Sequence, residues 1–168
     1  MEERTLTLKD GSRVRVRPLR PREDAPALER MFGRLSDRTR YLRYFGPKKE
    51  FPRQKLRRFA GPDGRNRLGL VALDPGDPRE IIAFVCYDRE GKEDAAEYAA
   101  VVEDRWQGKG LGLQMTRLLV EEARARGIRH LYALVLPENR PMLGLLGKLE
   151  LPDELGWEGG VERVSMRL

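Results

Sequence analysis

Residues 95–115 read AAEYAAVVEDRWQGKGLGLQM, and this stretch decides the fold. Its first eight residues are almost entirely apolar and carry one carboxylate, Glu97, as expected of a buried strand. A loop with glycines at 108, 110 and 112 follows, and the apolar spacing beyond it predicts an amphipathic helix over 110–127. Glycines let a ligand approach the main chain, and free N–H groups at a helix start attract anions. The stretch therefore predicts a strand, an anion-binding loop and a helix in succession.

The segments on either side of this unit predict further strands and helices. Alternating or buried-type apolar runs indicate strands at 13–17, 68–73, 80–87, 131–136 and 161–168. Helical spacing and capping residues indicate helices at 21–35, 36–45 and 137–149, with a short basic helix or turn at 51–60. This order predicts an α/β (α+β) fold, a single domain over 1–168 with a mixed, mostly antiparallel sheet of six or seven strands and about four helices.

Composition narrows the class of protein. The 168 residues carry a net charge of +6, which favours acidic partners such as nucleotides and coenzyme A derivatives. One cysteine and one histidine exclude an intramolecular disulfide and an ordinary Cys/His zinc site, so no metal is predicted. No apolar run approaches the length of ~20 residues that a membrane span needs, and residues 1–10 lack a signal-peptide core. We therefore expect a cytoplasmic protein with no membrane partner.

Several catalytic motifs are missing. The three serines form no G-x-S-x-G elbow, and QGKGLG matches neither a Walker loop nor the dinucleotide fingerprint. Cys86 and His130 are the residue types of a nucleophile and its base. However, Cys86 lies in the middle of an apolar strand, so we predict a small core residue there and a structural or exposed role for His130.

The pattern Gln107-x-x-Gly110-x-Gly112, after a strand and before a helix, resembles the GNAT family of N-acetyltransferases, whose acyl-CoA pyrophosphate loop reads Q/R-x-x-G-x-G/A. The resemblance covers nearly the whole chain. The first forty-five residues resemble bacterial protein-lysine acetyltransferases of the Pat type, which modify acyl-CoA synthetases and related enzymes. The resemblance implies the GNAT acyl-CoA N-acyltransferase fold, with acetyl-CoA as co-substrate and a cleft where the strands at 95–102 and 131–136 splay apart.

The resemblance also implies which residues bind the coenzyme. The main chain of Ala100, Val101 and Val102 would contact the pantetheine arm. The loop would hold the pyrophosphate, with Lys109 adding charge; its residues are Gln107, Gly108, Lys109, Gly110, Leu111 and Gly112. Asn139 matches a pantetheine-binding asparagine and is also a good N-cap for the last helix.

Glu97 is the candidate general base. Its small apolar neighbours would desolvate the carboxylate and raise its pKa, and an amine must lose a proton before it attacks a thioester. The alternative is a carboxylate that pairs with an arginine or faces solvent. Glu103 is the second candidate, although its place at the strand end favours solvent. Leu146 stands where the family often has a tyrosine acid, and Glu150 replaces a usual glycine, so the acceptor pocket departs from the family pattern.

The acceptor follows from the same resemblance. We expect transfer to a primary amine, foremost a protein lysine side chain, with an acyl-CoA synthetase as one candidate partner. A small-molecule amine acetyltransferase and a non-catalytic CoA- or RNA-binding module are the alternatives, and a nucleic-acid partner is the least favoured. Arginines and aromatics alternate at one segment, which predicts an acceptor-binding lip, an RNA grip or simply core aromatics beside solvated arginines. These residues are Arg38, Arg40, Tyr41, Arg43, Tyr44 and Phe45.

Overall fold

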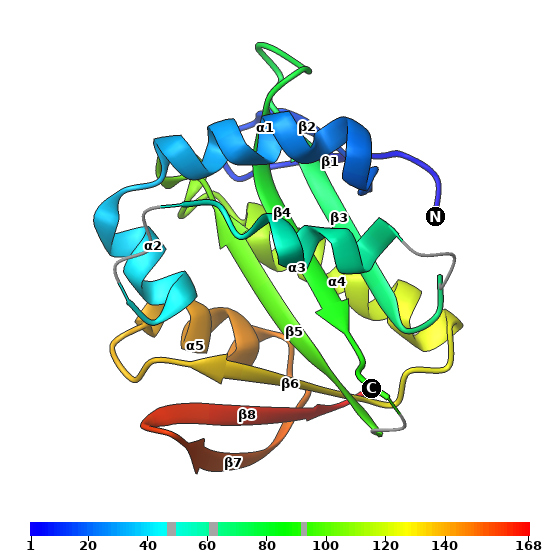
Figure 1. The fold of residues 1–168 in the computed structure, drawn as a ribbon, viewed down its shortest axis with the longest axis vertical. Helices are drawn as coiled ribbons and strands as arrows, with labels where there is room; N and C mark the ends of the chain where they lie inside the picture. Colours follow the sequence, from blue (N-terminus) through cyan, green and yellow to red (C-terminus); the bar gives the residue numbers. More distant parts are fainter. Residues whose placement is uncertain (47–49, 61–63, 92–93) are drawn as a thin grey trace.

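The structure, a computed structural model, describes residues 1–46, 50–60, 64–91 and 94–168, and its elements form one sheet flanked by helices (Figure 1). The strands are β1 (Arg4–Thr7), β2 (Arg13–Pro18), β3 (Arg67–Leu73), β4 (Ile81–Asp88), β5 (Ala95–Val102), β6 (His130–Val135), β7 (Pro152–Glu158) and β8 (Val161–Arg167). The helices are α1 (Pro21–Arg34), α2 (Asp37–Tyr44), α3 (Arg53–Arg57), α4 (Leu111–Ala125) and α5 (Arg140–Lys148). Short 3-10 turns lie at Arg58–Ala60 and Asp104–Trp106.

The sheet confirms the predicted mixed, mostly antiparallel class. Its described strands run in the order β1-β2-β3-β4-β5-β6-β8-β7. β5 and β6 are parallel and joined through α4, whereas the other neighbouring pairs of described strands are antiparallel. Among the described residues the sheet has eight strands rather than six or seven, because β1 and β7 add an edge strand at each end. In the same described part of the chain α3 brings the helices to five, at a segment where the sequence predicts a helix or a turn.

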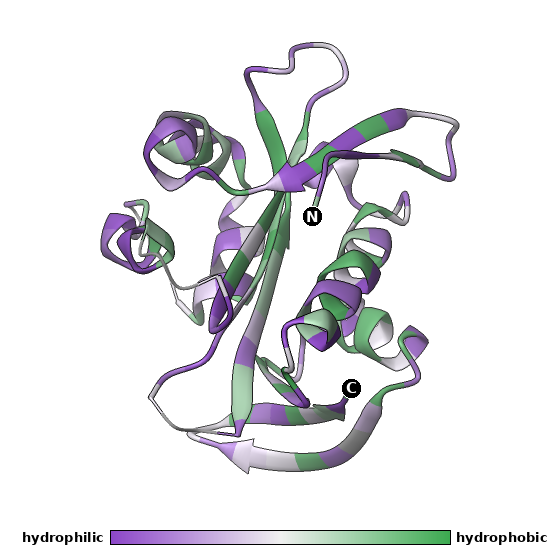
Figure 2. Cartoon of the chain, turned by 90° about the vertical axis from the view of Figure 1, so that its right-hand side faces the viewer, coloured by the Kyte–Doolittle hydropathy of each residue, from purple (hydrophilic) through white to green (hydrophobic). Residues whose placement is uncertain are grey.

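Helices cover both faces of the sheet, as Figure 2 shows. On one face α1 and α3 bury Leu28, Phe32 and Leu56 against the sheet. On the other face α4 buries its own apolar stripe, including Met115 and Leu119, and α5 packs beside it. β3 and β4 are therefore covered on both sides, which explains why their sequences are unbroken apolar runs. No helix within the described residues is both long and apolar enough to cross a membrane.

The sheet opens between its two parallel strands. β5 and β6 pair from Ala95↔His130 to Tyr98↔Ala133, yet β5 continues to Val102 with β4 on its other side. The last four residues of β5 thus have a partner strand on one edge and a gap on the other. This separation is the predicted splay, and it lies beside the start of α4.

Candidate active site

A cleft of about 370 Å³ opens where β5 and β6 separate. Its walls are the end of β5, the loop before α4, the first turn of α4, and parts of α2 and α5. Nine of the ten predicted coenzyme residues line it: Ala100, Val101, Val102, Gln107, Gly108, Gly110, Leu111, Gly112 and Asn139. The sequence motif and the splayed strands therefore meet in one cavity.

The three loop glycines have two different physical roles. Gly108 and Gly110 have φ values of +74° and +87°, a left-handed conformation that side chains other than glycine adopt at a cost. Gly112 is needed for packing, because a Cβ there would lie 3.2 Å from Leu145 Cδ1 and 3.4 Å from Val102 Cγ2. The chain thus turns sharply into α4, and the helix start lies close to both β5 and α5.

The start of α4 has the features of an anion-binding element. The first N–H groups of any helix have no intrahelical acceptor, and the helix dipole places partial positive charge there. In α4 these groups belong to Leu111, Gly112 and Leu113, and all three residues line the cleft. A phosphate at this point would receive main-chain hydrogen bonds without displacing a side chain.

Lys109 lies outside the cleft lining, although the sequence suggested it for the phosphates. Its ammonium group lies 3.1 Å from Asp10 Oδ2 and 4.7 Å above the ring of Trp106. Ser12 and Lys109 together lower the pKa of the Asp10 carboxyl to about 2. Lys109 is therefore occupied in fixing the turn between β1 and β2, whose Lys9 N–H donates to the Lys109 carbonyl at 3.0 Å.

Four other cations line the cleft instead: Lys9, Arg43, Arg140 and Lys148. None of them forms an ion pair with any residue that the structure describes. The indole N–H of Trp106, also at the cleft, is buried and has no acceptor among the described residues. Unpaired cations and a free donor around a helix start suit the phosphates of coenzyme A. Sequence reasoning missed these cations, although the i, i+4, i+8 spacing of Arg140, Gly144 and Lys148 is a signal for one helix face.

Gln107 and Asn139 line the cleft, and their side chains also form hydrogen bonds that fix the elements around it. The Gln107 side-chain amide donates to the Val102 carbonyl at 2.9 Å and to Thr39 Oγ1 at 3.2 Å. Asn139 caps α5, since its Oδ1 accepts from the Met142 N–H at 3.3 Å. The predicted cap is confirmed.

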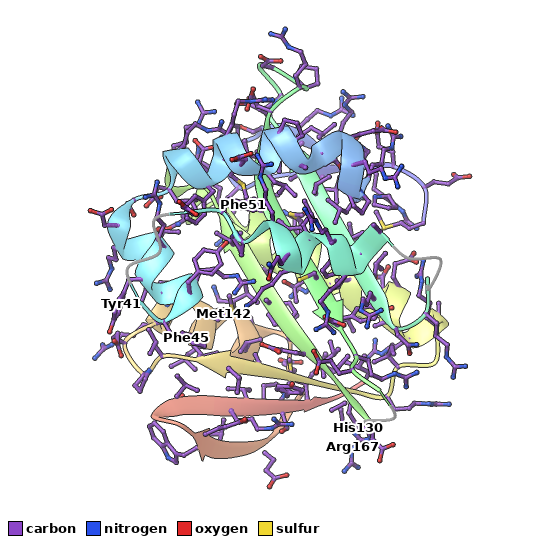
Figure 3. All side chains as sticks on the ribbon, in the orientation of Figure 1. Tyr41, Phe45, Phe51, His130, Met142 and Arg167 are labelled. Atoms are coloured by element: carbon purple, nitrogen blue, oxygen red, sulfur yellow. The ribbon has the colours of Figure 1, made fainter. Side chains whose placement is uncertain are left out.

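A smaller cavity of about 130 Å³ adjoins the cleft. The two share Leu42, Arg43, Ala100, Asn139 and Met142 as lining residues. The smaller cavity is completed by the end of α2, by Lys55 of α3 and by Glu97 of β5. Figure 3 shows Phe45 and Met142, two of its apolar lining residues, on neighbouring elements at the same side of the molecule. The coenzyme-type cleft and an acceptor-sized cavity thus meet at the splayed end of β5.

Glu97 opens onto the smaller cavity. Its side chain is exposed, so the expectation that apolar neighbours bury this carboxylate is wrong: the alternating strand buries Ala96 and Tyr98 on the other face. Within the described residues Glu97 forms no ion pair. Its cross-strand neighbour Asp88 is bound by Arg58 and Arg67, each at 2.8 Å. Glu97 is therefore a carboxylate with room for an incoming cation.

Glu103 differs from its expected position. It is buried rather than solvated, because Arg34 Nε lies 3.1 Å from Oε2 and Arg105 Nε lies 2.8 Å from Oε1. Two guanidinium groups hold this carboxylate in place beyond the end of β5. Glu103 is a structural ion-pair residue, which leaves Glu97 as the carboxylate of this strand that faces a cavity.

The remaining predicted residues have structural surroundings. Cys86 is buried in β4, and burial raises the pKa of its thiol to about 11, which confirms a core cysteine. His130 begins β6, and Figure 3 shows it at the opposite end of the sheet from Phe45 and Met142. Leu146 is buried in the core, so its position supplies no proton donor. No three His, Cys, Asp or Glu side chains gather as a metal site among the described residues.

The basic and aromatic segment at 38–45 packs one of its aromatics against the core and leaves others exposed. Tyr44 packs edge-on against Phe32, with ring centroids 5.7 Å apart, and Arg40 stacks on the same ring. Tyr41 and Phe45 remain exposed, and Tyr41 donates to Glu138 Oε1 at 3.3 Å. α2 is thus anchored in the core by one face while its other face borders the cavities.

A splayed parallel pair, a helix start facing the gap and an adjoining acceptor cavity define an acyl-CoA N-acyltransferase. The family model described as "Acetyltransferase (GNAT) family" matches residues 34–150, and the chain belongs to this family of N-acetyltransferases. An acetyltransferase of Pseudomonas aeruginosa, PA5475, is 33% identical over 88% of this chain and 82% of its own length.

Two further relatives bear on the acceptor. The L-methionine sulfoximine/L-methionine sulfone acetyltransferase of Pseudomonas paraeruginosa is 32% identical over 60% of this chain and 61% of its own length. The crystal structure of the GNAT domain of PAT from S. lividans superposes with a TM-score of 0.88 at 34% identity, covering 99% of this chain and 97% of that one. Of these relatives, only the Pseudomonas paraeruginosa enzyme has a name that states its substrates.

Proposed function

We propose that this enzyme transfers the acetyl group of acetyl-CoA directly to a primary amine, with Glu97 as general base. The observation that carries the proposal is the junction of the two cavities at Ala100 and Asn139. On one side of this junction lie the unpaired edge of β5 and the start of α4. On the other side lies the exposed carboxylate of Glu97. Both substrates are thereby held in contact, which lowers the entropic cost of their reaction.

The coenzyme is held by main chain and cations. N–H groups of Leu111, Gly112 and Leu113 bind the pyrophosphate, and the β5 edge from Ala100 to Val102 binds the pantetheine arm. The lining cations Lys9, Arg140 and Lys148 neutralise the phosphates. Bound acetyl-CoA supplies a thioester carbonyl that an amine can attack.

Glu97 makes the amine nucleophilic. A primary amine is protonated at neutral pH and has no free lone pair until it loses that proton. The Glu97 carboxylate accepts the proton directly or through one water. The carbon–nitrogen bond forms, and the nitrogen releases its second proton to water as it becomes an amide. The carbon–sulfur bond breaks, and the sulfur leaves as a thiolate that takes its proton from water, because Leu146 has none to give.

The acceptor has two candidates. A protein lysine side chain, for example of an acyl-CoA synthetase, is supported by similarity to the GNAT domain of PAT. A small amine is supported by the limited volume of the acceptor cavity and by the similarity to an acetyltransferase of methionine derivatives. A cytoplasmic setting belongs to the same proposal, as does the absence of a nucleic-acid partner.

Substitution of Glu97→Gln tests the base. It keeps the size of the side chain and removes its proton acceptor, so turnover should fall by well over tenfold while the Kd for acetyl-CoA changes less than twofold. The measurements are steady-state kinetics and titration calorimetry. Glu121→Gln, an exposed site on α4, is the matched control and should retain full activity. Unchanged turnover in Glu97→Gln would remove this residue from the mechanism.

A further inference from the structure

The charges of the acceptor cavity identify a class of acceptor. We infer that the acceptor carries an anionic group beside its amine, as a small α-amino acid does, and that Lys55 and Arg43 bind this anion. The inference rests on the proposed function, because it names the acceptor of that same site.

Among the residues that the structure describes, three charged side chains line the smaller cavity: Arg43 of α2, Lys55 of α3 and Glu97 of β5. Each comes from a different element, so the cluster exists only in the folded chain. Two cations and one carboxylate leave the cavity with an excess positive charge.

Among the described residues, neither of these cations has a carboxylate as its ion-pair partner. Arg43 stacks on the Tyr44 ring at 4.9 Å, and neither Arg43 nor Lys55 forms an ion pair with a described residue. Asp88, the carboxylate nearest to Glu97 across the sheet, is already bound by Arg58 and Arg67. An anion of the acceptor would therefore meet unpaired cations, which makes charge-assisted hydrogen bonds favourable.

An amino acid complements this arrangement at both of its charged groups. Its carboxylate fits the cations and its ammonium group fits Glu97, from which the proton is removed. A simple amine or polyamine brings only positive charge to a cavity with excess positive charge. A protein lysine likewise presents one ammonium group with no anion beside it.

The uncharged lining residues and the volume of the cavity indicate what kind of side chain the acceptor would have. Phe45, Leu134 and Met142 are apolar members of a lining in which polar surface is the larger share, and the volume of about 130 Å³ is roughly one third of the coenzyme cleft. These three side chains can contact an apolar or thioether-sized side chain of a small acceptor. A compact amino acid with such a side chain is the acceptor that fits both the charges and the walls.

A change at Lys55 can distinguish binding of the acceptor's anion from binding of the coenzyme. Arg43 lines both cavities, so its charge can serve the coenzyme as well as the acceptor. Lys55 lines the smaller cavity and not the cleft. A change at Lys55 should therefore affect the acceptor alone.

The first experiment compares each amino acid with its own carboxamide. L-leucine, L-methionine and L-methionine sulfone are assayed beside their carboxamides by loss of thioester absorbance at saturating acetyl-CoA. At least one acid should have a kcat/KM about tenfold or more above that of its carboxamide. The carboxamide has the less basic amine and loses its proton more readily, so without recognition of the anion it would react faster.

The second experiment removes the cation. Lys55→Gln should raise the KM for the preferred acid at least about fivefold, with kcat and the Kd for acetyl-CoA unchanged, and should leave the carboxamide kinetics unaltered. Arg57→Gln removes an exposed cation from the same helix without touching either cavity and is the matched control. Because Lys55 is exposed, its substitution is compatible with folding, which thermal unfolding verifies.

Three outcomes contradict the inference. Carboxamides used as well as acids would remove the anion from recognition while leaving acetyl transfer intact. Acetylation of lysine peptides with blocked termini, in preference to every amino acid, would make a protein the acceptor. Unchanged kinetics in Lys55→Gln would deny the assigned role of this residue. Failure to acetylate any amine would instead contradict the proposed function itself.

Discussion

At the scale of the residue, the positive charge in the coenzyme cleft comes from side chains that are far apart in the sequence. Lys9 lies on the turn between β1 and β2, outside the residues 34–150 that the family model matches. It reaches the cleft because its N–H donates to the Lys109 carbonyl and because Lys109 is paired with Asp10. The first turn of the chain is thereby part of the proposed phosphate site.

Lys9→Gln should weaken coenzyme binding while preserving the fold. Removal of one exposed cation beside phosphates should raise the Kd of coenzyme A about fivefold. Titration calorimetry with coenzyme A measures the change, and dephospho-coenzyme A shows whether Lys9 serves the 3′-phosphate or the pyrophosphate. Arg13→Gln, an exposed cation of the same hairpin that lies outside the cleft lining, is the control. Equal Kd values for Lys9→Gln and the unaltered protein would remove Lys9 from the site.

Glu150 is a strained residue at the end of α5. Its φ of +57° is left-handed, a region that costs about 1 kcal/mol or more for residues with a Cβ. The resemblance to the family implies a glycine at this position, and the backbone has the conformation that glycine favours.

Glu150→Gly should therefore stabilise the protein. We expect a gain of about 0.5–1 kcal/mol, since relief of the strain outweighs the extra freedom of glycine in the unfolded chain, and a rise in Tm of about 2–4 °C. Thermal and urea unfolding measure both quantities. Glu150→Ala keeps the Cβ and removes the rest of the side chain, so the strain remains and it should bring no comparable gain. A lower Tm in Glu150→Gly would contradict the strain argument.

At the scale of the element, α2 is held over the cavities by one carboxylate. Asp104 accepts hydrogen bonds from the Ser36 N–H at 2.9 Å, the Ser36 hydroxyl at 2.7 Å and the Thr39 hydroxyl at 2.9 Å. Ser36 is itself the N-cap of α2. The segment after β5 thus fixes the start of the helix that carries Leu42 and Arg43 into both cavities.

Asp104→Ala should loosen α2. Loss of these hydrogen bonds should cost about 1 kcal/mol of stability and raise the KM for acetyl-CoA, because one wall of the cleft is released. Burial alone would raise the pKa of Asp104, but the donors of Ser36 and Thr39 outweigh it and hold the pKa below its ordinary value of 3.8. The contribution is therefore present above pH 3.8 and is lost as the pH falls through the lowered pKa.

Urea unfolding at two pH values checks this sign. The stability difference between the unaltered protein and Asp104→Ala should be largest near neutral pH and should shrink at about pH 3. A difference that stays constant between the two pH values would show that the charge of Asp104 contributes nothing to the attachment of α2.

Most elements that the sequence predicts have a buried face, whereas α2, which has no buried residue, is predicted from its capping residues. β3, β4, β5 and α4 contribute to the core and show the expected apolar runs or stripes. β1 and β7 were not predicted, because edge strands can form by main-chain pairing with little burial. In β1 the side chains other than Leu6 are exposed, and in β7 Leu155 and Trp157 are 72% and 69% exposed. Neither strand has buried apolar residues at every second position, so the sequence contains no pattern that would predict a strand there.

At the scale of the whole molecule, the sequence predicts the parts of the site that have a local pattern and misses the parts that only tertiary packing brings together. The glycine loop and Glu97 are local in sequence, so their pattern and their place beside the cavities could be predicted. Tertiary packing brings three lysines from different parts of the chain to the cavities: Lys9, Lys55 and Lys148. No local sequence pattern predicts that these three residues lie near the same site. Burial of Glu103 was likewise missed, because its partners Arg34 and Arg105 meet it only in the fold.

The whole molecule is positively charged, with a net charge of +6, and unpaired cations border its coenzyme cleft. A strongly anionic coenzyme should therefore be attracted by the general field as well as by individual contacts. Salt screens exposed charges, with a Debye length that falls from about 10 Å at 0.1 M to about 3 Å at 1 M. The affinity for coenzyme A should accordingly depend on ionic strength.

Titration calorimetry between 50 and 500 mM potassium chloride tests this dependence. We expect the Kd of coenzyme A to rise about fivefold across this range, with a smaller rise in Lys9→Gln, because that variant has one charge fewer to screen. Pantetheine, which has no phosphate, is the control ligand and should bind with the same affinity at every salt concentration. A Kd of coenzyme A that did not respond to salt would mean that main-chain hydrogen bonds at the start of α4 hold the phosphates without help from the cations.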